Sequence, residues 1–346
     1  MNLRSDYISA KEEGRRADLR RSGRNAGTEL MAVGSPPATG AVAHIASVTL
    51  AMSCGSRDSR LQRDDDSRQR KFLSYVFYQA VRDHKPVWML EDMRTMETFY
   101  WEENISQRTY SPSEALLYAV VHDHQAYAQY LLSHYSEKAL EMPGERICCC
   151  PSSAPHLAMA VRYDRRDIIS LILQVAHRLP SLRSYMNRRG CFHLEDGKTP
   201  LHVACELLRS EAVLLLLGSG ASPQAEDHKG MTPLDVILEQ LGESKVNVLP
   251  KKLCLDHLLM FMPKVHFKMK STLLADSNSW KKVLGEDTFN YLVGRSPAPL
   301  FLIAMHTILQ QLPPSQFPQS LQELPIPTQF KSLLTPFKRC TNLDVV

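Results

Sequence analysis

Hydrophobic residues recur at helical spacing through most of the chain after residue 70. In KFLSYVFYQAVRDH, one helix face is marked out by Phe72, Tyr75, Val76 and Ala80. We expect this helix to end before Pro86, and VWMLEDMRTMETFYW to form a second short helix. Residues 1–70 show no such period and are rich in Arg, Ser, Gly and Asp, so we predict a disordered basic extension.

A repeat of 33 residues begins near residue 196, where DGKTPLHVACELLRSEAVLLLLGSGASPQAED is followed by HKGMTPLDVILEQL. The residues that recur are Gly197, Thr199, Pro200 and Leu201, as Gly230, Thr232, Pro233 and Leu234. Glycine allows the positive φ of a tight turn, threonine is a good N-cap, and proline suits the first helical position. A second helix, AVLLLLGSG, can end at Gly220. Such a helix pair cannot bury its hydrophobic faces alone, so we expect it to stack on copies of itself.

This pattern resembles the ankyrin repeat. The T-P-L-H-x-A hallmark is present at residues 199–204, and the turn typical of the family is represented by Gly220, Ala221 and Ser222. Degenerate copies lie upstream, where the positions of Leu201 and Ala204 are taken by Leu116 and Ala119 and by Leu157 and Ala160. The resemblance implies an all-α ankyrin solenoid, in which His202 is a turn-stabilising hydrogen-bond partner rather than a catalytic group.

We divide the chain accordingly into six segments. They are a disordered extension (1–70), an N-terminal helical cap (71–110), about four ankyrin repeats of which the first two are degenerate (111–245), C-terminal capping helices (246–295), a C-terminal module (296–338) and a tail (339–346). The capping helices are predicted in KKLCLDHLLMFM and SNSWKKVLGEDTFNYLV, which would cover the hydrophobic face of the last repeat.

The C-terminal module begins with an almost uncharged helix, SPAPLFLIAMHTILQQL, in which Leu300, Ala304 and Ile308 lie at i, i+4 and i+8. It is hydrophobic on nearly every side, so one face can pack on the preceding helices while the rest must meet another chain. Further on, Pro325 and Pro327 exclude both helix interior and central strand from LPIP.

These two segments together resemble the SOCS box. The elongin-binding helix of that family is matched by Pro299, Leu300, Ala304 and Ile308, and its cullin-selecting segment by Leu324, Pro325, Ile326, Pro327, Phe330, Leu333 and Leu334. The chain departs from the family pattern in having Ala304 for the commoner Cys, Phe330 for Leu, and Leu333 where Tyr is frequent.

The resemblance implies a cytoplasmic, non-catalytic substrate receptor of a cullin-RING ubiquitin ligase. Its partners would be elongin B, elongin C, cullin-5 or another elongin-using cullin with its RING subunit, and a target protein held by the ankyrin surface. An ankyrin-repeat scaffold without a ligase role is the alternative, and it would explain the hydrophobic helix as a further cap.

Charge and hydrophobicity argue against nucleic acid and membrane partners. Residues 1–71 carry 13 Lys and Arg and 9 Asp and Glu and so account for the whole net charge of +4, while the remainder holds 28 of each sign. We therefore expect no basic face for nucleic acid on the folded part. The longest weakly polar run, GAVAHIASVTLAMSC, is shorter than the roughly 18–20 residues that span a bilayer.

No cofactor, metal or catalytic centre is predicted. The eight cysteines are read as free thiols, and the adjacent Cys148, Cys149 and Cys150 cannot all point to one ion. The His122-x-His124 pair is a weak metal signal without further ligands. The phosphate-binding, dinucleotide-binding and serine-hydrolase motifs G-x-x-x-x-G-K-[ST], G-x-G-x-x-G and G-x-S-x-G do not occur in the chain, so we do not expect an enzyme.

Overall fold

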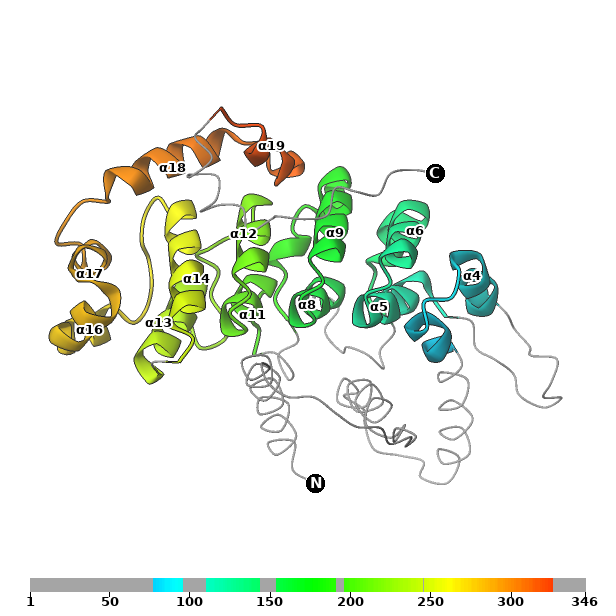
Figure 1. Cartoon of the computed structure of the whole chain (residues 1–346), viewed down its shortest axis with the longest axis horizontal. Helices are drawn as coiled ribbons and strands as arrows, with labels where there is room; N and C mark the ends of the chain where they lie inside the picture. The colour runs from blue at the N-terminus through cyan, green and yellow to red at the C-terminus, as the bar shows by residue number, and fades with distance from the viewer. Residues whose placement is uncertain (1–76, 96–109, 144–153, 191–195, 245, 326–346) are drawn as a thin grey trace, which may run out of the picture. The chain divides into compact units, whose positions relative to one another are not determined.

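Helices make up all the regular structure in the part of the chain that the computed structural model describes, which is residues 77–95, 110–143, 154–190, 196–244 and 246–325 (Figure 1). This confirms the predicted all-α class. The described residues belong to one compact unit, 44–346. The predicted disordered extension, the tail, and Cys148, Cys149 and Cys150 lie outside the described residues.

Four consecutive helix pairs form the central part of the described chain. They are α5 (Pro112–His122) with α6 (Gln125–Tyr135), α8 (Pro155–Arg162) with α9 (Arg166–Arg178), α11 (Pro200–Glu206) with α12 (Ser210–Gly218), and α13 (Pro233–Glu243) with α14 (Val248–Phe261). The first helices contact one another in the order α5, α8, α11, α13, and the second helices in the order α6, α9, α12, α14. The pairs therefore stack as two parallel rows, as Figure 1 shows.

Short 3₁₀ turns connect some of these pairs. They are η1 (Ser136–Ala139), η2 (Pro180–Leu182) and η3 (Tyr185–Asn187).

The turn inside each of the first three pairs has the same geometry. A left-handed residue occupies it, with φ of 57° at Asp123, 56° at Asp164 and 56° at Leu208. Each lies four residues after the alanine that the sequence alignment places in the inner helix, namely Ala119, Ala160 and Ala204, and all three alanines are fully buried. The missing side-chain bulk lets the neighbouring first helices approach closely.

The same turn occurs once more, before the first predicted repeat. His84 has φ 51° and follows the buried Ala80 by four residues, and the Lys85 amide donates to the Ala80 carbonyl at 3.0 Å, as Arg209 does to Ala204 at 2.9 Å. This turn joins helical residues 77–82 to α4 (Val87–Thr95). We propose that the N-terminal cap is built as a further helix pair of the repeat.

The segment after α13 covers the end of the stack. Because α14 packs against α12 and α13, we propose that the fourth repeat extends to Phe261, past the predicted boundary at 245. Three short helices follow, α15 (Lys270–Ala275), α16 (Ser277–Leu284) and α17 (Glu286–Val293), and the single stretch expected in SNSWKKVLGEDTFNYLV is interrupted at Gly285, where φ is 89°.

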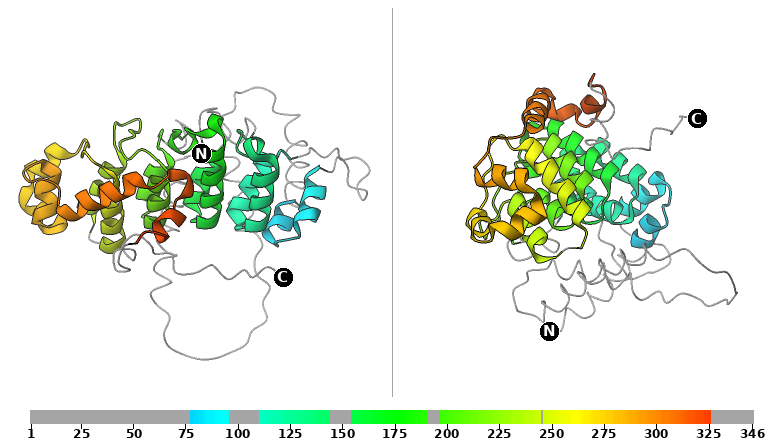
Figure 2. Two further views of the ribbon diagram at one scale, coloured as in Figure 1. Left: turned by 90° about the horizontal axis from the view of Figure 1, so that it is seen from above. Right: turned by 60° about the vertical axis from the view of Figure 1, so that its left-hand side comes forward.

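A final group of helices lies across the second row. It comprises α18 (Leu300–Gln311), η4 (Pro314–Gln316) and α19 (Gln319–Gln322). The helix α18 contacts α14, and Figure 2 shows it, in orange, lying across the helix stack. These helices share a separate hydrophobic core, here called the second cluster, with buried members Leu214, Met260, Met305, Leu309, Phe317 and Leu321. The larger core runs through the helix pairs from Phe77 to Val293.

Neighbouring pairs are also joined at their turns by a side-chain contact that recurs. Asp123 pairs with Arg165 at 3.6 Å, and Asp164 pairs with Arg209 at 3.7 Å. In both cases the aspartate is the left-handed residue of one helix pair. The arginine directly follows the left-handed residue of the next pair, which is Asp164 for Arg165 and Leu208 for Arg209. At the first junction these two positions are His84 and His124, whose rings stack with centroids 4.8 Å apart. A pair of imidazoles thus replaces the acid–base pair.

Both turn histidines of the first repeat are held in the neutral form. Burial, followed by the nearby Arg82, Arg165 and His84, lowers the pKa of His122 to about 4, against a smaller opposing effect of Asp83. Burial also lowers the pKa of His124, whose Nε2 donates to the Lys85 carbonyl at 3.0 Å while Nδ1 accepts from the Tyr127 amide. His84 donates through Nε2 to the His122 carbonyl at 3.1 Å.

The first junction is therefore predicted to weaken in acid. Because the folded pKa of His122 is near 4 and that of an unfolded histidine near 6.5, the unfolded chain binds the proton first. The folding stability that neutral His122 contributes is fully present above about pH 6.5 and is lost as the pH falls toward 4. We expect a loss of about 1 kcal/mol, since the ring is only partly buried. Hydrogen exchange of residues 77–95 should be faster at pH 5 than at pH 7.5, after correction for intrinsic rates.

The matched control removes the titrating ring. His122→Phe keeps an aromatic ring that can pack on Tyr78, but it has no group that takes up a proton. This variant should lose less protection in acid than the natural chain. Equal losses in both proteins would show that His122 is not the acid-sensitive element.

Candidate protein-interaction surfaces

The T-P-L-H-x-A turn of the third repeat is built around His202. Its Nδ1 accepts from the Thr199 amide at 3.2 Å and from the Thr199 hydroxyl at 2.7 Å, and its Nε2 donates to the Met231 carbonyl at 2.9 Å. Burial is the main cause that lowers the pKa of His202, so the ring is neutral and both nitrogens are occupied. His202 links the start of its own helix to the next repeat.

Asp235 occupies the same place in the fourth repeat. Its carboxylate accepts from the amide and hydroxyl of Thr232 at 2.9 and 2.8 Å, from the Lys268 amide at 3.0 Å and from the Met269 amide at 2.8 Å. His202 meets a carbonyl and must donate, whereas Asp235 meets amide groups just before α15 and must accept. The change from His to Asp thus suits a last repeat followed by a cap.

The hairpin glycines named from the sequence have the left-handed backbone expected of them. Gly197, Gly220 and Gly230 have φ of 65°, 92° and 68°. At Gly197 a Cβ would also meet the ring of the exposed His228, which would have to move. The remaining repeat residues are buried: Thr199, Pro200, Leu201, Ala204, Thr232, Pro233 and Leu234.

The Cys205 thiol lies sealed inside the stack, one helical turn after His202. Burial, and then the neighbouring Cys254, raises the pKa of Cys205 well above its usual range, and burial raises that of Cys254 to about 12. Both thiols are therefore protonated and shielded. Within residues 77–325, so far as they are described, no group of three or more His, Cys, Asp or Glu side chains is placed to hold a metal ion.

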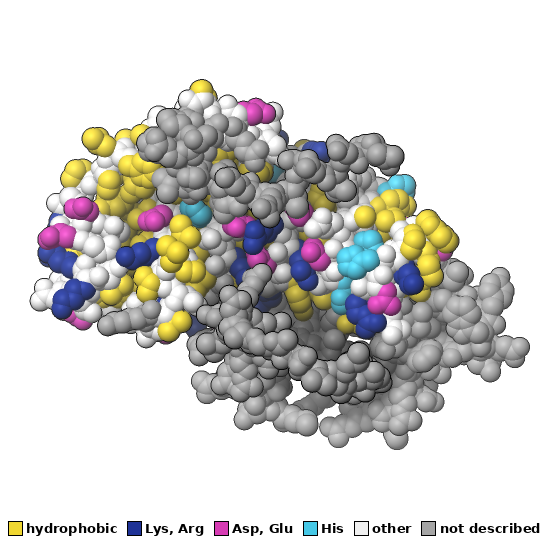
Figure 3. Space-filling model, in the orientation of Figure 1, with side chains coloured by type: hydrophobic (Ala, Val, Ile, Leu, Met, Phe, Trp, Pro, Cys, Tyr) yellow, Lys and Arg dark blue, Asp and Glu magenta, His cyan; other side chains and the backbone are white. Residues whose placement is uncertain are grey.

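The C-terminal helix α18 is buried along one face only. Met305 and Leu309 lie in the second cluster, with Leu302 and Leu312 partly buried beside them. On the opposite side Leu300 is 84% exposed and Ile303 48% exposed, and Ala304 and Thr307 are exposed too. We call these four residues the exposed face of α18. Figure 3 shows hydrophobic side chains gathered over this helix.

The two predicted binding segments lie at the ends of this group of helices. In the first, Pro299, Leu300 and Ala304 are exposed and Ile308 is half-buried. In the second, Leu324 is half-buried against the second cluster and Pro325 is exposed. The rest of that segment, which is Ile326, Pro327, Phe330, Leu333 and Leu334, lies outside the described residues.

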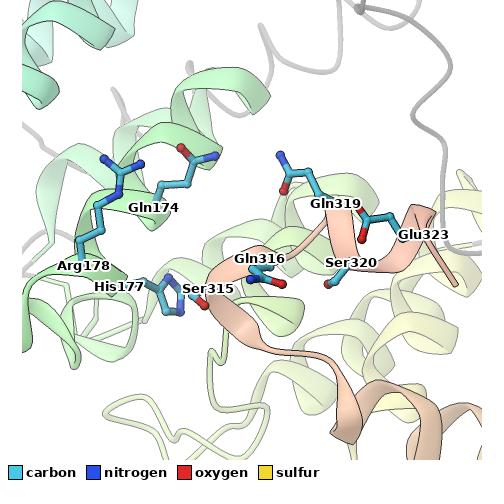
Figure 4. Close-up of a pocket in the computed structure, with 8 residues that line it drawn as sticks. All are labelled: Gln174, His177, Arg178, Ser315, Gln316, Gln319, Ser320 and Glu323. Atoms are coloured by element: carbon cyan, nitrogen blue, oxygen red, sulfur yellow. The ribbon is translucent and has the colours of Figure 1, made fainter.

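The structure adds a contact that the sequence did not indicate. Phe317, between α18 and α19, is buried against α12 directly over Gly218. Beside it, an open cleft of about 600 Å³ separates α9 from the connecting segment (Figure 4). The cleft is lined by polar side chains: Gln174, His177, Arg178, Ser315, Gln316, Gln319, Ser320 and Glu323.

Comparison with known proteins agrees with this architecture. The ankyrin repeat family model matches residues 196–228, which span the α11–α12 pair and its hairpin. Over 294 residues the chain is 41% identical to ankyrin repeat domain-containing protein 9 of Mus musculus, and the match covers 77% of this chain and 90% of the mouse protein. The chain belongs to the ankyrin repeat domain-containing protein 9 family. Its helical stack is an ankyrin-repeat solenoid.

Membership of this ankyrin repeat family gives the stack a role in protein–protein interaction. Repeat solenoids offer extended surfaces for protein partners, and each repeat contacts only its neighbours. No helix among residues 77–325 that the structure describes is long and apolar enough to cross a membrane.

The cap contact at Asp235 yields a stability prediction. Asp235→Asn places an NH₂ group against amide donors, so at least one buried donor loses its acceptor. We expect a loss of about 2–3 kcal/mol in urea unfolding, with the first loss of hydrogen-exchange protection in α15 and α17. Asp92→Asn, an exposed residue of α4, is the matched control and should be neutral. Equal effects of the two substitutions would contradict the assigned role of Asp235.

Proposed function

We propose that this chain is a non-catalytic substrate-recognition subunit of an elongin B/C cullin-RING E3 ubiquitin ligase. In this role it promotes the ubiquitination and proteasomal degradation of a protein that its repeats bind. The observation that carries the proposal is the exposed face of α18, a hydrophobic surface on a helix that is otherwise packed on the solenoid.

The two faces of α18 follow from helical geometry. At 100° per residue, Leu302, Met305 and Leu309 fall on one side, and Leu300, Ala304 and Thr307 on the other. Packing on α12 and α14 covers the first side and leaves Leu300 almost as exposed as in an unfolded chain. Burial of Leu300 and Ile303 by a partner would contribute about 2–4 kcal/mol.

The exposed face of α18 also overlaps the SOCS-box-like pattern, with which it shares Leu300 and Ala304. Pro299, Leu300 and Ala304 are all accessible, and Ile308 lies at the border between the two faces. The small side chain of Ala304 would let the partner's backbone approach near the middle of the helix. A helix with one such stripe typically docks into a hydrophobic groove, and we propose that elongin C supplies that groove.

The LPIP segment extends the proposal to a cullin. Pro325, where the described chain ends, is exposed. We propose that residues from Leu324 through Leu334 contact cullin-5 or another elongin-using cullin, which brings the RING subunit.

The proposed mechanism is geometric. The repeats hold the target while α18 holds the adaptor, and a separate E2 and the RING subunit carry out ubiquitin transfer. The receptor raises the effective concentration of a target lysine near the charged E2. The polar and thiol groups that sequence inspection might single out for catalysis, His202 and Cys205, are taken up by packing within the stack.

A scaffold without ligase function accounts for only part of this arrangement. It explains why Met305 and Leu309 pack on the solenoid, but it gives no role to the exposure of Leu300 and Ile303. The two hypotheses differ in whether elongins B and C bind the purified chain.

The test is a binding titration of the full chain with purified elongin B/C. Leu300→Asp and Ala304→Arg should each weaken the complex about 30- to 100-fold, because each places a charge in a hydrophobic contact worth about 2–3 kcal/mol. Leu249→Asp is the matched control, since Leu249 is also a strongly exposed leucine, at 70%, and it lies at the start of α14. This control should bind like the natural chain.

Two results would contradict the adaptor role. One is no association of the natural chain with elongin B/C at micromolar concentrations. The other is the same affinity for Leu300→Asp as for Leu249→Asp. Either result would favour the scaffold.

A further inference from the structure

The glycine that ends α12 packs against an aromatic side chain far away in the sequence. Gly218 is the last residue of α12 and is not among the residues with positive φ, so its backbone does not require glycine. A Cβ at this position would overlap three atoms of the Phe317 ring. Position 218 is therefore a glycine because the Phe317 ring occupies the space that a side chain would need.

Phe317 is a buried member of the second cluster. It is 6% exposed and meets Phe261 of α14 edge-on, with ring centroids 6.4 Å apart. The ring thus contacts two helices of the solenoid, at Gly218 of α12 and Phe261 of α14. The same cluster includes Leu214 from α12, Met305 and Leu309 from α18, and Leu321 from α19, so it joins both C-terminal helices to the solenoid.

The contact between η4 and α9 adds less to the attachment of the C-terminal helices. Where η4 approaches α9, the facing side chains are polar and border an open cleft, as Figure 4 shows for Gln174, Arg178 and Gln316. His306 adds one long hydrogen bond, of 3.4 Å, to the Met260 carbonyl. Hydrophobic burial in the second cluster, where Phe317 packs beside the direct contact of α18 with α14, is therefore the main source of attachment.

The second cluster is also separate from the larger core. Its buried members do not belong to the continuous core of the helix pairs, and only the partly buried Phe261 and Leu302 pack against both. Loss of packing here should open α18 and α19 locally while the repeats remain folded, because local stability follows local burial.

We propose that the Phe317–Gly218 contact is a positioning device that fixes α18 on the solenoid and so sets the direction in which its exposed face points. The contact determines the orientation of a docked adaptor relative to a target on the repeats. That last consequence rests on the proposed ligase function, whereas the fixing of α18 does not.

The test uses hydrogen exchange of the full chain in three variants. Gly218→Ala should lower the protection of residues 300–311 about 10- to 100-fold and leave that of α8 and α11 unchanged. A loss of protection would point to the Phe317 contact, because alanine in place of glycine normally stabilises a helix. Phe317→Ala should give the same local loss. In Gly218→Ala with Phe317→Leu the smaller side chain leaves room for the methyl group, so protection should rise above that of Gly218→Ala alone.

Each outcome decides the proposal. Unchanged protection of residues 300–311 in Gly218→Ala, loss of protection throughout the repeats, or no recovery in the double variant would each overturn it. Elongin B/C binding to the natural chain is measured separately. If the exchange results are as expected and elongin B/C does not bind, the proposed ligase function fails and the positioning role stands.

Discussion

Every helix pair in this chain has a hydrophobic face that only a neighbouring pair can cover. The buried alanines of the first helices, Ala80, Ala119, Ala160 and Ala204, allow the close approach that this covering needs. The recurring left-handed turns keep each second helix in line with the one before. Side-by-side packing is thus the constraint on which the rest of the structure depends. It leaves hydrophobic surface at the two ends and along one side of the stack, which other segments must cover.

Hydrogen bonds attach the segment that covers the C-terminal end, and hydrophobic packing attaches the helix that covers the side of the stack. At the C-terminal end, Asp235 replaces the histidine of the repeat and accepts hydrogen bonds from the amides just before α15. On the flank, α18 is attached through a small, separate hydrophobic cluster. That cluster covers only one side of a helix that is hydrophobic on nearly all sides, so the exposed face of α18 follows directly from how α18 is attached.

Local patterns predicted the repeats well, because the determinants of a repeat lie within a few residues. The TPLHVA run predicts the third helix pair. The comparison of the repeats places Ala119 and Ala160 in the first helices of their pairs, and each lies four residues before a left-handed aspartate. The sequence predicts a cap around His84, and the further helix pair that we propose there is inferred from its left-handed turn after Ala80. A left-handed leucine at Leu208 has no signature in sequence at all.

Long-range contacts could not be predicted in this way. The acceptor role of Asp235 depends on backbone amides of Lys268 and Met269, which carry no side-chain pattern. The match of Gly218 with Phe317 joins distant segments and becomes visible only in three dimensions. For α18 the sequence indicated a partner-facing surface, and the structure distinguishes the residues that pack inward from those that remain exposed.

The central claim is that another protein, elongin C, covers the exposed face of α18. Site-specific photo-crosslinking in cells tests it most directly, with a benzophenone amino acid at Ile303 and, as control, at Trp88 of α4, which is even more exposed. Our account predicts that position 303 captures elongin C and that position 88 does not. Crosslinks from 303 that reach only the chain's own solenoid, or capture of elongin C from both positions alike, would contradict it.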